Sequence, residues 1–190
     1  MSNIGTWAQR VAQDWLVLEL TGSAQILGIV TGLQFAPTLF LSLWAGSLAD
    51  KFDKRKLLYI TNFGAGIVSA WLGLLIVSGS VEIWHVYVAA LSLGVFSALD
   101  APVRTSFTSE LVGRTDLPNA VSLNSANFNV GRLVGPAMSG FLILLFGTGP
   151  SFLINSFSYV VMIVTLTMIN AEELHTHKGS ELGTKIRDAL

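Results

Sequence analysis

The charged residues of this chain are confined to a few short stretches, and the segments between them are apolar. Residues 20–49, 57–81 and 133–171 contain no Asp, Glu, Lys or Arg. An α-helix crosses the roughly 30 Å hydrocarbon core of a bilayer with about 20 mostly apolar residues. The third stretch would form a helix about 58 Å long, so we expect it to turn at the Gly-Thr-Gly-Pro run of residues 147–150. The pattern therefore predicts membrane-spanning helices.

This pattern divides the chain into six predicted spans. They cover residues 3–20, 25–49, 57–79, 84–110, 119–146 and 151–170. The connections are short, as is typical of antiparallel neighbouring helices, and residues 111–118 are expected to form the one between the fourth and fifth spans. The predicted fold class is an all-α membrane protein with a bundle at residues 1–170 and a polar tail at residues 171–190. The polar start of the first span indicates that part of this helix and its leader are missing from the chain.

Composition agrees with a membrane protein and excludes several other classes. Apolar residues make up 52% of the chain and charged residues 12%, whereas an average soluble domain is about 25% charged. The net charge of −1 argues against a nucleic acid partner, and the absence of cysteine excludes a disulfide framework and a thiolate metal site. His175 and His177 are expected to belong to an exposed tail, so we predict no metal site. No Walker loop, nucleophile elbow or dinucleotide fingerprint occurs, which argues against a cofactor and against an ATP-driven pump.

The basic residues indicate which side of the membrane each connection occupies. Eight of the eleven Lys and Arg residues fall in the second-to-third connection, the fourth-to-fifth connection or the tail. Cytoplasmic loops carry an excess of Lys and Arg. We therefore expect these segments, and both termini, to be cytoplasmic. The eight residues are Lys51, Lys54, Arg55, Lys56, Arg114, Lys178, Lys185 and Arg187.

Residues 46–56, Gly-Ser-Leu-Ala-Asp-Lys-Phe-Asp-Lys-Arg-Lys, form the strongest local motif. They resemble the G-x-L-A-D-R-x-G-R-K signature between helices two and three of the major facilitator superfamily, with Asp53 departing at the second glycine of that signature. The resemblance implies a cytoplasmic gate in which Asp50 interacts with its basic neighbours or with the positive end of a helix. The gating motif consists of Gly46, Asp50, Lys51, Lys54 and Arg55.

A second motif lies in the predicted fifth span, at residues 131–140. It resembles the G-x-x-x-G-P-x-x-x-G element in helix five of drug and proton antiporters of the same superfamily, and this resemblance implies efflux. Pro136 is expected to bend the helix. The flanking glycines are expected to let another helix pack against the bend. The matching residues are Gly131, Gly135, Pro136 and Gly140.

Further segments resemble the enterobactin-exporter-like, or transmembrane secretion effector, branch of the superfamily. They are residues 3–7, 13–16, 20–23, 100–104 and 119–124. The resemblance implies the N-terminal half of a twelve-helix transporter of the bacterial inner membrane, each half being two inverted three-helix repeats. A second six-helix half would then be missing, and residues 171–190 would begin the cytoplasmic linker to it.

Five charged residues lie within predicted spans and away from their ends, where charge is costly and by default suggests function, whereas Glu19 and Glu110 lie near span ends and are expected to be solvated. Arg10 and Asp14, like Asp100 and Arg104, are four residues apart, so each pair shares a helix face and can form an ion pair. Arg132 stands alone. In the superfamily, helices one and four line the central cavity, so these residues are candidates for substrate contact or proton coupling. The alternative is that the pairs are structural and never titrate.

The sequence favours a secondary active transporter, with protons as the expected coupling ion, exporting a siderophore, drug or metabolite. Two alternatives stay open. One is a half-size or truncated membrane protein that does not transport, and the other is a membrane-embedded enzyme, for which the sequence shows no nucleophile or metal constellation. The expected partners are the lipid bilayer, the missing half, a small-molecule substrate and protons.

Single cysteines test the orientation, because the chain has none of its own. Cysteines replacing Asp53 and Glu181 should be protected from a membrane-impermeant thiol reagent in intact cells, whereas cysteines replacing Gly22, Ser80 and Gly149 should be labelled. The reason is that Lys and Arg hold their side of the protein in the cytoplasm. Labelling of position 53 together with protection of position 80 would reverse the orientation.

Overall fold

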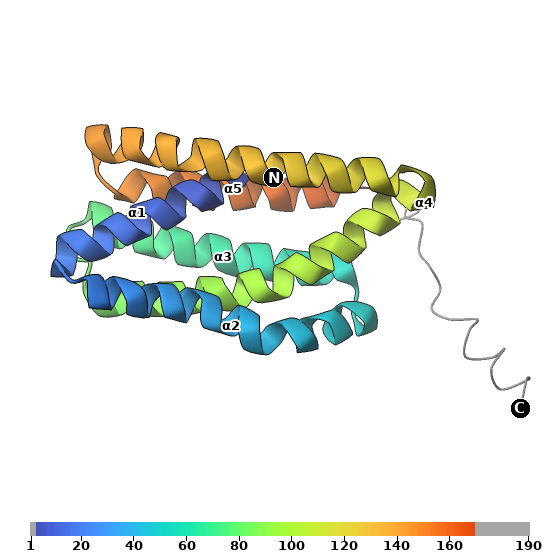
Figure 1. Cartoon of the computed structure of the whole chain (residues 1–190), viewed down its shortest axis with the longest axis horizontal. Coiled ribbons are helices and arrows are strands. Elements are labelled where there is room, and N and C mark those ends of the chain that lie inside the picture. Colours follow the sequence, from blue (N-terminus) through green and yellow to red (C-terminus); the bar gives the residue numbers. More distant parts are fainter. Residues whose placement is uncertain (1–2, 170–190) are drawn as a thin grey trace, which may run out of the picture.

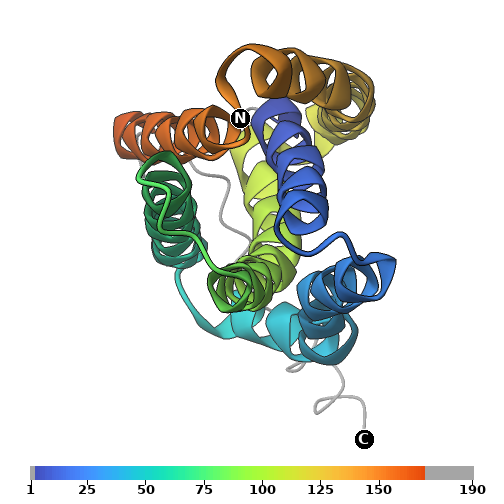
Figure 2. The ribbon, with the colours of Figure 1, turned by 90° about the vertical axis from the view of Figure 1, so that its left-hand side faces the viewer.

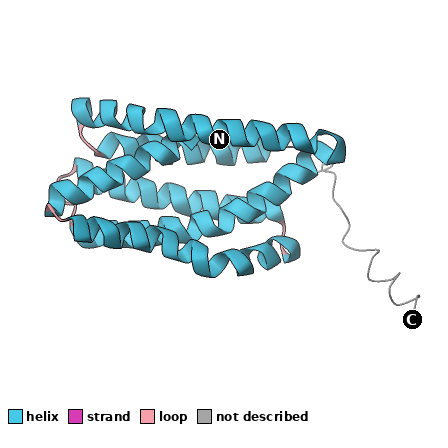
Figure 3. Ribbon diagram, in the orientation of Figure 1, coloured by secondary structure: helices cyan, strands magenta, loops and turns pink. Residues whose placement is uncertain are grey.

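The computed structural model describes residues 3–169, apart from the side chains of residues 42–43, 45–51, 110 and 113–115. The described residues form helices joined by short turns (Figures 1 and 3). The helices are α1 (Asn3–Thr21), α2 (Ala24–Lys51), α3 (Lys54–Val77), α4 (Ile83–Phe146) and α5 (Gly149–Met168). The predicted all-helical membrane fold is confirmed, and the tail at residues 171–190 lies outside the described residues.

Helix α4 contains two of the predicted spans. As a straight rod its 64 residues would be about 96 Å long, but Figure 1 shows that it runs to one end of the bundle and then returns. Its segments Ile83–Ser109 and Asp116–Phe146 are each long and apolar enough to cross a membrane. The junction of these segments falls in the region of the connection predicted at residues 111–118, and the backbone stays helical through it. Pro118 lies inside α4, where it removes one backbone hydrogen bond and favours a local bend.

The connections gather at the two ends of the bundle, so consecutive segments run antiparallel. The turns that follow α1 and α3 and the turn between α4 and α5 lie at one end in Figure 1, and the α2–α3 connection and the bend of α4 lie at the other. Five segments qualify as membrane spans by length and hydropathy, one each in α2, α3 and α5 and two in α4. With the more polar α1, the described chain has the six segments predicted from the sequence.

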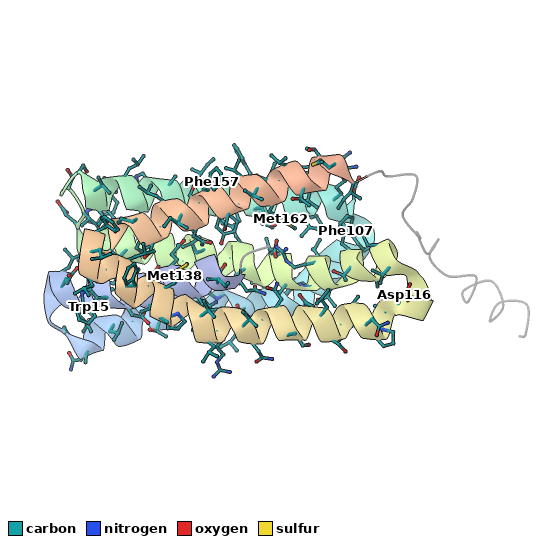
Figure 4. All side chains as sticks on the ribbon, turned by 90° about the horizontal axis from the view of Figure 1, so that it is seen from above. Trp15, Phe107, Asp116, Met138, Phe157 and Met162 are labelled. Carbon is teal, nitrogen blue, oxygen red and sulfur yellow. The ribbon has the colours of Figure 1, made fainter. Side chains whose placement is uncertain are left out.

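Two apolar clusters lie toward opposite ends of the bundle. Nine buried residues, including Leu16, Leu72 and Phe152, join α1, α2, α3, α4 and α5 near the end where the tight turns gather. A smaller cluster around Leu58 and Phe107 joins α3, α4 and α5 toward the other end, where Figure 4 shows Phe107 near Met162. Large apolar side chains also cover the outer surface, as a lipid environment allows.

Glycines set the distance between several helices. Seen end-on in Figure 2, α1 lies beside the returning half of α4, and α3 lies beside α5. An added Cβ at Gly135 would come within 2.5 Å of the Trp7 Cβ and 3.0 Å of the Ile4 carbonyl oxygen. An added Cβ at Gly73 would come within 2.9 Å of a Leu153 methyl group. These contacts leave no room for a side chain, so glycine permits the close crossing.

Gly135→Ala is expected to destabilise the bundle by about 1–3 kcal/mol, because the new methyl group must push α1 away. The matched control is Gly140→Ala on the same helix, since a Cβ there meets nothing within 4 Å. Reversible unfolding in mixed detergent micelles measures both variants. Equal stability of the two would show that the α1–α4 crossing tolerates a methyl group.

Candidate functional site

A polar cavity of about 280 Å³ lies inside the bundle and is lined by side chains from all five helices. Each of the two candidate pairs in the predicted spans contributes to it. Arg10 of α1 represents the first pair, and Asp100 and Arg104 of α4 form the second. The two apolar clusters contribute none of their fully buried side chains to its wall. The cavity is therefore the place where the described bundle concentrates polar groups.

The Asp100 carboxylate is the most extensively bonded group of this cavity. Its Oδ2 accepts from the Arg104 guanidinium, with Nε at 2.7 Å. Its Oδ1 accepts from the Thr61 hydroxyl at 3.0 Å and from the Asn62 amide at 2.9 Å. The predicted pairing of Asp100 with Arg104 is thus confirmed, and the two α3 residues are partners that sequence reasoning missed. Both oxygens of the carboxylate are satisfied, as a charge at membrane depth requires.

A second polar cluster joins α1, α3 and α5 at the same cavity. The Gln9 side-chain Oε1 accepts from the Ser69 hydroxyl at 2.9 Å and from the Asn155 side-chain amide at 2.7 Å. The Asn155 side-chain Oδ1 accepts from the Ser158 hydroxyl at 2.9 Å. Sequence reasoning missed these residues because it considered only charged ones. Amides within apolar spans were the available signal, since such side chains commonly form hydrogen bonds between membrane helices.

The predicted pairing of Arg10 with Asp14 is wrong. Within the described part of the chain, these residues form no ion pair, although both belong to α1. The Arg10 guanidinium carbon instead lies 5.0 Å from the Trp7 ring centre and 5.2 Å from the Phe35 ring centre. Arginine stacks readily on aromatic faces, and the approach of α2 supplies the second ring, which spacing along α1 does not reveal.

A second cavity of about 300 Å³ lies between α1, α2 and the returning half of α4. Arg10 and Asp14 line it, and so do Arg132 and Pro136 of the helix-five motif. Arg132 forms no ion pair among the described residues, as expected, but its guanidinium carbon lies 6.0 Å from the Trp7 ring centre. The structure therefore brings the candidates of α1 and of the fifth span together.

The helix-five motif packs against α1 through only part of its length. An added Cβ at Gly131 would meet the backbone of Asn3 and Ile4, and Gly135 meets the next turn of α1. Gly140 is exposed and has no neighbour within 4 Å. The predicted packing is confirmed for the first two glycines and wrong for the third, because α1 crosses the fifth span over its earlier turns.

The gating motif is described only in part. The side chains of Gly46, Asp50 and Lys51 lie outside the described residues. Arg55 donates to the Thr167 carbonyl oxygen at 3.1 Å and so joins the start of α3 to the end of α5. Lys54 begins α3.

Asp53, which departs from the family signature, is the N-cap of α3. Its carboxylate accepts from the backbone N–H groups of Arg55 at 2.9 Å and Lys56 at 3.3 Å. Its φ of −61° and ψ of 111° are extended, so no glycine is needed here. Aspartate is a preferred N-cap because its carboxylate satisfies helix N–H groups that have no other partner. The substitution therefore preserves an ordered start of the helix.

The helical bundle and its polar interior define a multi-pass membrane protein of the transporter type. The model of the transmembrane secretion effector family matches residues 1–190. The chain therefore belongs to this family, a branch of the major facilitator superfamily, as the sequence motifs predicted.

The chain is also similar to three individual transporters. The chain is 32% identical to the staphyloferrin A transporter of Staphylococcus aureus, over 85% of the chain and 41% of the relative. It is 28% identical to the multidrug efflux pump Tap of Mycolicibacterium fortuitum, over 85% and 41%. It is 26% identical to the enterobactin exporter EntS of Shigella flexneri, over 75% and 30%. The chain thus spans less than half the length of these relatives and corresponds to their N-terminal half.

A double-mutant cycle measures the strength of the Asp100–Arg104 pair. Asp100→Ala and Arg104→Met are expected to show a coupling energy of about 1–3 kcal/mol, because the side chains are only 19% and 25% exposed. The control cycle uses Trp15 and Glu19, another i,i+4 pair, bonded at 2.9 Å but exposed. It is expected to give about 0.5 kcal/mol or less. Both cycles are measured by unfolding in mixed micelles. Equal coupling energies in the two cycles would contradict a stabilising role of the Asp100–Arg104 pair.

Proposed function

We propose that this chain is the N-terminal six-helix half of a secondary active transporter that exports a small organic molecule. The observation that carries this proposal is the polar cavity at the centre of an otherwise apolar bundle, with an ion pair in its wall. Charged groups within a membrane mark substrate and ion pathways. The names of the relatives, two siderophore-related transporters and a drug pump, support export of a siderophore, a drug or a metabolite.

The proposed transporter requires a second bundle. The chain spans 41% of the staphyloferrin A transporter, and pseudo-symmetric halves are the usual plan of such transporters. We expect residues 171–190 to begin the cytoplasmic linker to that half. In this arrangement both termini of the chain face the cytoplasm of the cell, and Asp50 lies at the cytoplasmic gate.

Asp100 is the proposed site of proton coupling. Its carboxylate links α4 to two neighbouring residues of α3 and to Arg104. Uptake of a proton would remove the charge that holds Arg104 and turn one acceptor oxygen into a donor. The contacts between α3 and α4 would then rearrange, and alternation between the two arrangements would couple proton movement to the opening of the cavity. The alternative is a permanent structural pair.

Asp100→Asn is expected to abolish uphill export, because an amide does not release a proton at physiological pH. Passive exchange of substrate should largely survive, since Asn keeps the size and an acceptor oxygen of Asp. The measurement uses proteoliposomes that contain the complete two-half transporter, with an imposed pH gradient for uphill export and no gradient for exchange.

Glu19→Gln is the matched control, because it also exchanges a carboxylate for an amide but lies exposed and outside both cavities. It should transport normally. Uphill export by the Asp100 variant at the rate of the unsubstituted transporter would show that the carboxylate is only a structural partner of Arg104. Absence of both export and exchange in the unsubstituted transporter would contradict the transport function itself.

A further inference from the structure

Arg10 separates the two cavities. Its side chain lines both of them, together with Trp7 and Gln34. Its guanidinium is held against two aromatic rings rather than by a carboxylate. Its Nε is buried and has no hydrogen-bond partner within the described residues. The side chain is thus positioned by ring contacts, while its Nε–H donor is left without a partner among the described residues.

Arg132 approaches the same ring from the fifth span. The guanidinium carbons of Arg10 and Arg132 lie 5.0 and 6.0 Å from the Trp7 ring centre, so they are no further apart than the sum of these distances. Neither forms an ion pair with another described residue, and the buried Arg10 Nε has no hydrogen-bond partner among them. Asp14 is the one carboxylate among the described residues of the second cavity wall, so this wall carries one positive charge in excess.

The first cavity does not offset this excess. Its Asp100 carboxylate is occupied on both oxygens by Thr61, Asn62 and Arg104. No lone carboxylate in that wall is therefore available to a positively charged ligand among the residues described. Counted together, the two walls contain three guanidinium groups and two carboxylates.

The aromatic side chains also argue against a cationic ligand. Trp7 and Phe35 would be the natural rings to hold an organic cation. Arg10 already occupies both of them, so a second cation would meet repulsion there. A carboxylate would instead find donors in a planar fork, the geometry in which arginine binds such groups most strongly.

We propose that Arg10 and Arg132 form a binding site for an organic anion, with a carboxylate between the guanidinium groups and an apolar or aromatic body against Val11 and Pro136 of the second cavity wall. Volumes of about 280 and 300 Å³ for the two cavities suit a small molecule. The proposal rests on the transport function proposed above and narrows its substrate to an anion.

Three probes of matched shape test the sign of the charge: 1-naphthaleneacetate, its neutral amide, and 1-naphthaleneethylamine. Binding to the purified chain in nanodiscs is measured by calorimetry, without any transport assay. The acetate should bind at least about tenfold more tightly than the amide or the amine, as expected for a charge-assisted bond to arginine. Arg10→Gln and Arg132→Gln should each weaken acetate binding by about tenfold and leave amide binding unchanged.

Lys56→Gln is the control for loss of a positive charge, because Lys56 is exposed at the start of α3 and lies outside both cavities. It should bind the acetate normally. Arg132 is also exposed, so its variant keeps the test valid if Arg10→Gln does not fold. Tighter binding of the amine, equal affinity for all three probes, or binding of none would each overturn the anion site. Normal anion preference in a transporter that moves no substrate would instead count against the transport function alone.

Discussion

The arrangement of the bundle depends on how closely α1 approaches the returning half of α4. Gly131 and Gly135 present bare backbone to α1, so the two helices meet without intervening side chains. In a membrane, where lipid removes the usual hydrophobic drive between helices, such close packing is a main source of association. The crossing places Trp7 beside the fifth span, and one turn later it places Arg10 between two cavities. The positions of Arg10 and Arg132 relative to Trp7 follow from this crossing.

Polar groups at the centre impose a second constraint. An unpaired polar group in hydrocarbon costs several kcal/mol, which favours partners on neighbouring helices for the Gln9 amide and the Asp100 carboxylate. Asp100 finds them on α3, and Gln9 finds them on α3 and α5. These bonds fix the rotation of each helix about its own axis, which apolar packing alone specifies weakly. The same bonds would have to break or exchange if the cavity is to open alternately to the two sides of the membrane.

The start of α3 shows how a motif can change without losing its structural role. Asp53 occupies a position where the related signature has glycine, yet the backbone there is extended and the carboxylate caps the helix. Arg55 then reaches the last turn of α5. A positive side chain suits the negative end of a helix, so this contact stabilises the junction of the two helices.

The sequence by itself determined the spans. The length of an apolar segment is a local property, and the thickness of the bilayer fixes the length that a spanning helix needs. It also determined the Asp100–Arg104 pair, since both residues lie on one helix with i,i+4 spacing. Only the tertiary structure decided that Thr61 and Asn62 complete this pair and that Phe35 of α2 lies against the Arg10 guanidinium. The physical reason is that a side chain at membrane depth takes the best partner among all neighbouring helices, and spacing along one helix records only the partners on that helix.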